Sequence, residues 1–239
     1  MKAILRCGLS AGLAVAIAFE GFNHPAAAVP QGPRPAFTIH LRNYAGVPSG
    51  TLAEAERVAT AIFRGAGIET RWNEMDVSGG RVKATVAQDQ LMTLADIQVN
   101  VLPETAAIPA GVSESVMGVA VGTGPDRTLV DVFDGRVRAL FWKISSAYLK
   151  GDMDRPISRG QLLGHVIAHE VGHLLLNRQG HSPSGIMRGD WAFADFRDMA
   201  SGMLLFTSQQ AQFMRAEVVR RDEREPTSVA ATGSPSTTR

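Results

Sequence analysis

The stretch HEVGHLLLNRQGHSPSGIM, which runs from His169 to Met187, is the part of the chain from which the rest is best understood. His169 and His173 stand four residues apart, so on a helix they lie about one turn apart on one face. Two imidazoles at this spacing can bind one metal ion. Glu170 points roughly 100° around the helix from His169, away from such a metal and toward a water bound on it. The spacing therefore predicts a metal site with an acid–base residue beside it.

The residues before this stretch predict that it lies in a helix. Ser158 and Gln161 form the capping-box pattern that opens many helices. An apolar stripe then runs along one side of the helix, formed by Leu163, Ile167, Val171 and Leu174. His169 and His173 lie more than about 90° from the centre of this stripe. We therefore expect one side of the helix to meet a core and the other to face a cleft.

A third ligand is expected, because catalytic zinc sites use three protein ligands and leave one position open. His181 is the best candidate, since Asn177 can take the left-handed conformation that ends a helix and Gly180 frees the chain just before His181. In an alternative interpretation His181 is a bystander, and the third ligand comes from one of three aspartates, Asp190, Asp195 or Asp198.

His165 lies one turn before His169 on the same helix. It would be about 12 Å along the axis from His173, which is too far for both to bind one ion. We expect it to support the ligands from behind or to line the cleft, or else to be an ordinary hydrogen-bonded histidine.

The motif resembles the signature of the metzincins, zinc endopeptidases that carry HExxHxxGxxH followed by a methionine turn beneath the metal. By that resemblance His169, His173 and His181 are the metal ligands. Glu170 takes the place of the general base, and Met187 takes the place of the methionine in the turn.

The resemblance covers Ser158 to Trp191, and within it the spacing departs from the pattern. His181 lies two residues further on than the signature allows, and Leu176 or Asn177 occupies the position of its glycine. The residue after the third histidine, Ser182, is the one that matrixin-like members carry. The resemblance implies an α+β, zincin-like fold.

The first 28 residues predict a signal peptide. Lys2 and Arg6 give a basic start, Cys7 to Phe19 form an apolar run, and an A-x-A site precedes cleavage after Ala28. This run falls short of the roughly 20 residues that span a bilayer. We therefore expect a secreted or periplasmic protein with no membrane contact after cleavage.

Charge and cysteine content exclude several kinds of partner and chemistry. Without Lys2, Arg6 and Glu20 of the leader, the 24 basic and 23 acidic residues of the chain become 22 of each. A neutral protein lacks the excess positive charge that attracts nucleic acid or an anionic membrane. Cys7 is the one cysteine and belongs to the leader, so the mature chain has no disulfide and no thiolate ligand. We expect a monomer stabilised by packing.

Hydrophobic patterns predict a twisted mixed sheet of four to five strands, with a backing helix and an active-site helix. The backing helix begins with Thr51 as its cap and ends near Gly65, and a later helix has Asp134 as its cap. The expected strands are 37–41, 68–72, 96–102, 116–121 and 128–133, with 82–86 as a further short strand. We expect 29–225 to form one domain with a cleft between about 29–176 and 177–225. The second part would be smaller, mostly irregular or helical, with a capping box at Thr207 and Gln210, and 226–239 would be a disordered tail.

Taken together, the sequence predicts a secreted zinc endopeptidase. It would use one Zn²⁺, a zinc-activated water and Glu170 as general base to hydrolyse a peptide or protein substrate. One alternative is an HExxH hydrolase of gluzincin or aspzincin type with an aspartate as third ligand. The other is an exported zinc-binding protein without catalysis.

Overall fold

The computed structural model describes residues 33–76, 83–84, 93–107, 116–122, 126–151, 153–177 and 180–224. A compact unit begins at Arg34, and the fold below is that of this unit. The predicted signal peptide, its cleavage site after Ala28 and the predicted tail 226–239 lie outside the described residues. No helix in the described part of the chain is long and apolar enough to span a bilayer.

The described strands form one mixed sheet, as predicted. Its order is β3-β2-β1-β4-β6-β5, and the strands are β1 (Ala36–Asn43), β2 (Glu69–Asp76), β3 (Lys83–Ala84), β4 (Asp96–Leu102), β5 (Gly118–Val121) and β6 (Leu129–Phe133). Four of them, β2, β1, β4 and β6, run parallel, whereas β3 and β5 pair antiparallel at the two edges. The two-residue β3 lies within the further short strand expected at 82–86, so the sheet has six strands. The expected strands 116–121 and 128–133 correspond to β5 and β6, which pair antiparallel, and β5 lies at the edge of the sheet.

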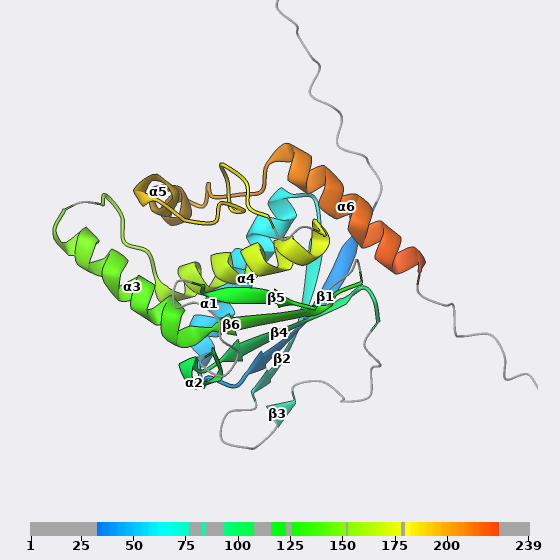
Figure 1. The fold of residues 1–239 in the computed structure, drawn as a ribbon, viewed down its shortest axis with the longest axis horizontal. Coiled ribbons are helices and arrows are strands. Elements are labelled where there is room, and N and C mark those ends of the chain that lie inside the picture. Colours follow the sequence, from blue (N-terminus) through cyan, green and yellow to red (C-terminus); the bar gives the residue numbers. More distant parts are fainter. Residues whose placement is uncertain are drawn as a thin grey trace, which may run out of the picture. The chain divides into compact units, whose positions relative to one another are not determined.

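Two helices pack on one face of the sheet, α1 (Ser49–Gly65) and α4 (Arg159–Leu175) (Figure 1). The remaining helices are α2 (Glu104–Ala107), α3 (Asp134–Leu149), α5 (Phe193–Ser201) and α6 (Ser208–Glu223). The fold is therefore α+β, with the predicted backing helix α1 and the predicted motif helix α4 side by side on the sheet.

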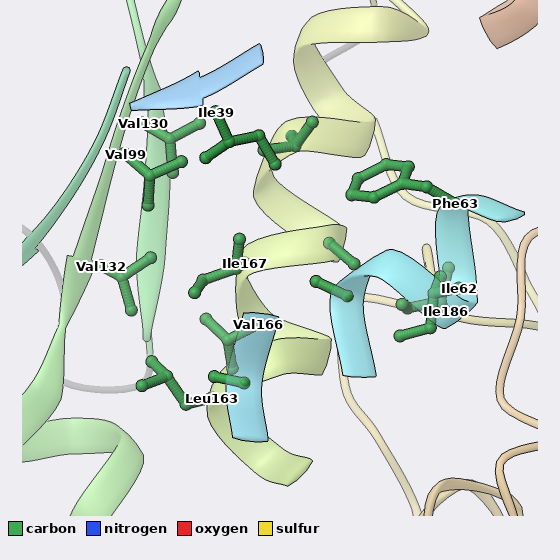
Figure 2. Close-up of a cluster of buried hydrophobic side chains, with 14 of the residues drawn as sticks. Ile39, Ile62, Phe63, Val99, Val130, Val132, Leu163, Val166, Ile167 and Ile186 are labelled. Carbon is green, nitrogen blue, oxygen red and sulfur yellow. The ribbon is translucent and has the colours of Figure 1, made fainter. Parts of the chain in front are cut away.

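The core lies between the sheet and these two helices. Figure 2 shows Val99, Val130 and Val132 of the sheet facing Leu163, Val166 and Ile167 of α4. All six are at most 1% exposed, and burying such a side chain stabilises the fold by about 1.5–3 kcal/mol. Alternate residues of each strand point to the opposite face of the sheet, and several of these residues are polar. There Asn100 accepts a hydrogen bond from Gln98 at 2.9 Å and donates one to Asp131 at 2.8 Å.

The helix caps were predicted correctly at two helices and wrongly at two others. Capping boxes open α4 at Ser158 and α6 at Thr207, as the sequence indicated. By contrast, α1 begins at Ser49, ahead of the expected Thr51 cap, because the carbonyl of Pro48 already accepts the N–H groups of Thr51 and Leu52. Asp134 is the first residue of α3 instead of its cap, because its carboxylate pairs with Arg159 at the start of α4.

Candidate metal centre

The helix α4 carries the three motif residues on the side that faces a cavity. His169, Glu170 and His173 are 8%, 7% and 7% exposed, so each is buried yet reaches a cavity. The apolar stripe predicted from the sequence packs into the core on the other side, with Leu163, Ile167 and Val171 fully buried. The helix therefore presents one apolar and one functional side, as expected.

The chain leaves the helix and returns to the histidines within a few residues. Asn177 has a φ of 48°, the left-handed conformation that its residue type predicted for the helix end. His181, on the irregular segment that follows, then lies beside the other two histidines. One ring nitrogen from each of His169, His173 and His181 lies within 4.8 Å of the others. The structure thus brings together the three histidines that the sequence singled out.

The spacing of these nitrogens fits a metal ion bound between them. Nε2 of His169 and Nε2 of His173 are 3.1 Å apart. Two nitrogens bound to one tetrahedral zinc at about 2.0–2.1 Å would be about 3.3–3.4 Å apart. His169 and His173 can therefore bind such an ion with a shift of a few tenths of an ångström.

Hydrogen bonding and burial prepare His169 for this role. Its Nδ1 lies 2.7 Å from the carbonyl oxygen of Ile186, which can only accept, so Nδ1 carries the proton and Nε2 keeps its lone pair. Burial lowers the pKa of His169 to about 4, and the neighbouring imidazoles of His173 and His181 add to this effect. The ring is therefore neutral at physiological pH, which is the state that binds a metal.

Glu170 lies beneath the edge strand β5. A Cβ atom built on Gly118 would come within 2.7 Å of the Glu170 Cγ, so only glycine leaves room for this carboxylate. Burial raises the pKa of Glu170 to about 8 from an ordinary value of 4.5. A dication beside it would favour the charged form and oppose this effect. The position suits a group that takes up and releases a proton.

Met187 packs against α4 beside Gly172, the neighbour of His173. Gly185, with a φ of 72°, turns the chain, and the carbonyl of Met187 accepts a hydrogen bond from the Ser182 N–H at 2.8 Å. A Cβ atom on Gly172 of α4 would lie 2.6 Å from the Met187 sulfur, so the methionine packs closely against the metal helix. The side chain is 1% exposed, and its role as a turn beneath a metal stays a prediction.

The histidines open into a cavity of about 360 Å³. One wall is the segment from Val116 to Ala120, which includes the start of β5, and the opposite wall runs from Arg188 to Trp191. The indole of Trp191 meets the His169 ring edge-on, with 5.7 Å between ring centroids, and donates to the Ile186 carbonyl at 3.2 Å. The cavity therefore has an edge strand on one side and the segment after Met187 on the other.

Two expectations about other residues need correction or refinement. His165 does not line the cavity; its Nδ1 bonds the Gln161 carbonyl at 2.8 Å, and burial lowers its pKa to about 4, so the ordinary hydrogen-bonded alternative applies. Within the described part of the chain, Asp195 does not belong to the histidine cluster; its carboxylate accepts the Ala192 N–H at 2.7 Å and pairs with Arg188. Among the described residues, neither Asp190 nor Asp198 belongs to the histidine cluster.

The structure adds positioning residues that sequence reasoning missed. Gly189 leaves space for the third histidine, since a Cβ atom there would lie 2.8 Å from Nδ1 of His181. Two buried arginines hold the end of α4: Arg127 donates to the His173 carbonyl at 3.2 Å, and Arg221 donates to the Leu174 carbonyl at 3.3 Å. The last carbonyls of a helix lack partners within it, which is the one signal that could have pointed to such residues.

Comparisons with known proteins add no identification. No family model matches the chain, and no curated protein matches it. The functional argument therefore rests on the chemistry of the site.

Proposed function

We propose that this protein is a zinc-dependent endopeptidase of metzincin-like type, with a zincin-like fold. The observation that carries the proposal is the convergence of three histidines and one buried glutamate on a single cavity. Three nitrogen ligands with an open fourth position are typical of catalytic zinc, whereas structural zinc sites are closed by four ligands. Glu170 beside the ligands favours an enzyme over a protein that only binds zinc.

His169, His173 and His181 would hold the ion, and zinc, when bound, supplies a Lewis acid that polarises a carbonyl and activates water. Glu170 accepts the proton of the attacking water and then delivers it to the leaving amine. Its burial under Gly118 keeps the carboxylate close to the cavity, and its partly apolar surroundings favour proton uptake. The Ile186 carbonyl keeps His169 in one tautomer while this proton moves.

An extended peptide is the substrate that best fits the wall formed by β5. The Met117 carbonyl accepts the Phe133 N–H at 2.8 Å, so Met117 points its backbone groups toward β6. Backbone direction alternates along an antiparallel strand, and therefore Gly118 and Ala120 point theirs away from β6, toward the cavity side. A substrate strand can pair with these groups, as in other cases of strand addition to a sheet edge.

The proposal includes export, a monomeric state and independence from nucleic acid, and these rest on the sequence alone. The predicted signal peptide and the balanced charge of the remaining chain support them. An enzyme outside the cytoplasm with no thiol ligand would keep its zinc without redox control.

The proposal is tested on protein beginning at Val29, by elemental analysis of zinc and by cleavage of unfolded casein. The parent is compared with Glu170→Gln, which keeps the shape of the side chain but cannot accept the proton. We expect one zinc per chain in both proteins and a loss of at least about 10²-fold in cleavage rate for the variant.

Three results would contradict this proposal in different ways. A parent without zinc would exclude a zinc hydrolase. Bound zinc without cleavage of any protein or peptide substrate would favour the non-catalytic zinc-binding protein. Full activity in Glu170→Gln would assign the base to another group.

A further inference from the structure

A second cavity, of about 700 Å³, adjoins the metal cavity. The two share Met117 on one side and the segment from Gly189 to Trp191 on the other. The far wall of the second cavity is the first half of α3, which packs against α4 (Figure 1). A substrate that extends past the metal in this direction enters the second cavity.

The position of Glu170 indicates which part of a substrate would enter the second cavity. Glu170 must reach the leaving nitrogen, and its side chain lies against Gly118, next to Met117. The leaving fragment therefore starts near Gly118. Met117, just before β5, lines both cavities, whereas Gly118, Val119 and Ala120 of β5 line only the metal cavity. The fragment therefore continues past Met117 into the second cavity.

The second cavity has an apolar base and a cationic rim. Leu140, Trp191 and Phe196 supply apolar surface. Arg138 and Lys143 are exposed on α3, and within the described part of the chain neither forms an ion pair.

The other charged groups of this cavity leave an excess of positive charge. Arg136 is buried and already donates to Glu104 at 3.0 Å and to the Val116 carbonyl at 2.6 Å, so this pair is neutral. Asp190, on the opposite wall, is the remaining acidic residue. Two cations, Arg138 and Lys143, thus face one anion.

We infer that the second cavity binds a carboxylate on the leaving fragment of the substrate, through Arg138 and Lys143. The inference rests on the proposed peptidase function and narrows its substrate class. The carboxylate has two possible sources, an Asp or Glu side chain a few residues after the cleaved bond or the free C-terminus of a short leaving fragment. Both present the same group to the same two cations.

The experiment uses the zinc-loaded protein and one peptide taken from a casein cleavage site, with its charged residues replaced by Gln. A single Glu is then placed at each of the first four positions after the cleaved bond, with the C-terminus amidated. We expect kcat/KM to rise about fivefold at one of these positions relative to Gln, as for a partly exposed ion pair. The same peptides truncated after that position, as free acid and as amide, test the terminal carboxylate.

The double variant Arg138→Gln/Lys143→Gln should bring this ratio of kcat/KM values to about one. Lys150→Gln, an exposed charge just past the end of the same helix and outside the cavity, should keep it. A preference for Glu would identify a side chain as the source of the bound carboxylate, and a preference for the free acid would identify the C-terminus. Each preference supports the inference if the double variant loses it.

Cleavage with no preference for either carboxylate, or a preference that survives in the double variant, would overturn the assignment of this cavity and leave the peptidase proposal intact. A protein that cleaves none of the peptides and holds no zinc would instead overturn the proposed function.

Discussion

The candidate metal centre has two halves that differ in how the chain supports them. His169 and His173 lie on α4, a buried helix with a capping box at its start and arginines on its last carbonyls. His181 lies on an irregular segment and is exposed. Core packing fixes the first two ligands, whereas turns and small residues place the third. Changes in the helical half should therefore alter folding stability and metal binding together, and changes in the irregular half should alter metal binding alone.

The largest expected effect is the loss of a ligand from either half. His173→Ala removes a ligand from the rigid half and should abolish zinc binding even in excess zinc. His181→Ala should weaken zinc binding by more than the roughly 10²-fold that a lost outer partner costs, but excess zinc should restore part of it, because His169 and His173 remain aligned. Zinc titration with a competing chelator measures both.

Full zinc stoichiometry in His181→Ala at low free zinc would contradict the assignment of the third ligand. The exposed Asp190 on the cavity wall would then be the residue to test. That outcome would favour the alternative HExxH hydrolase with an aspartate ligand.

The two halves also differ in how far the sequence predicted them. The helix cap at Ser158, the apolar stripe and the histidine spacing are local features, so α4 and the directions of its side chains followed from the sequence. The same holds for Asn177, whose left-handed conformation is a local preference.

The rest depends on contacts between residues far apart in the chain. Arg127 and Gly118 reach the site from the β5–β6 hairpin, and nothing near them in the sequence indicates α4 as their partner. Gly189 faces His181 only because the chain has turned at Gly185. Asp134 was expected to cap its own helix, and the Arg159 that occupies its carboxylate lies 25 residues away.

The next largest effect concerns the anchor of the helical half. Arg221 is 1% exposed and donates to the Leu174 carbonyl and, at 2.8 Å, to Glu217. Arg221→Met removes the buried guanidinium, although the Leu174 carbonyl still accepts the Asn177 N–H and Glu217 still accepts from Arg220. We therefore expect the free energy of unfolding to fall by about 2 kcal/mol, the value of hydrogen bonds to a charged group. Urea denaturation in the presence of EDTA measures this without a contribution from metal.

Arg224→Met is the matched control, because Arg224 is exposed and pairs with Asp126 at 3.1 Å in solvent. It should cost less than about 1 kcal/mol. Equal losses in the two variants would show that Arg221 does not anchor the end of α4.

A smaller effect is expected from a methyl group in the irregular half. Gly189→Ala places a Cβ atom 2.8 Å from Nδ1 of His181 and must displace the ring. We expect zinc affinity to fall by about 10- to 100-fold, as when other supports of a ligand are lost. The free energy of unfolding of the zinc-free protein should change by less than about 0.5 kcal/mol.

Gly180→Ala serves as the control in the same segment, since a Cβ atom there meets nothing within 4 Å. Its zinc affinity should match that of the parent. If Gly189→Ala lowers stability as much as it lowers zinc affinity, the irregular half is part of the folded core and the contrast between the halves fails.

The smallest effect is a pH dependence of stability at α1, the helix that packs beside α4. Burial raises the pKa of Glu56, on α1, to about 7 from 4.5, and the nearby carboxylate of Glu74 adds to the shift. The folded protein therefore binds this proton more tightly than the unfolded chain, so its contribution to stability is full below pH 4.5 and is lost as the pH rises to about 7.

Glu56→Gln should remove this loss of stability at high pH, because glutamine does not ionise. The side chain is only half-buried, so the gain above pH 7 should be about 1 kcal/mol, well below what the full shift would give. Urea denaturation between pH 4.5 and 8, with EDTA present so that the histidines bind no metal, measures the gain. Glu69→Gln, which instead removes a partner of Arg34 at 3.0 Å, should show no gain at high pH. Parallel pH profiles for the parent and Glu56→Gln would mean that Glu56 is charged in the folded protein at no cost, and the pH dependence would then have to arise from the buried histidines of α4, where protonation acts with the opposite sign.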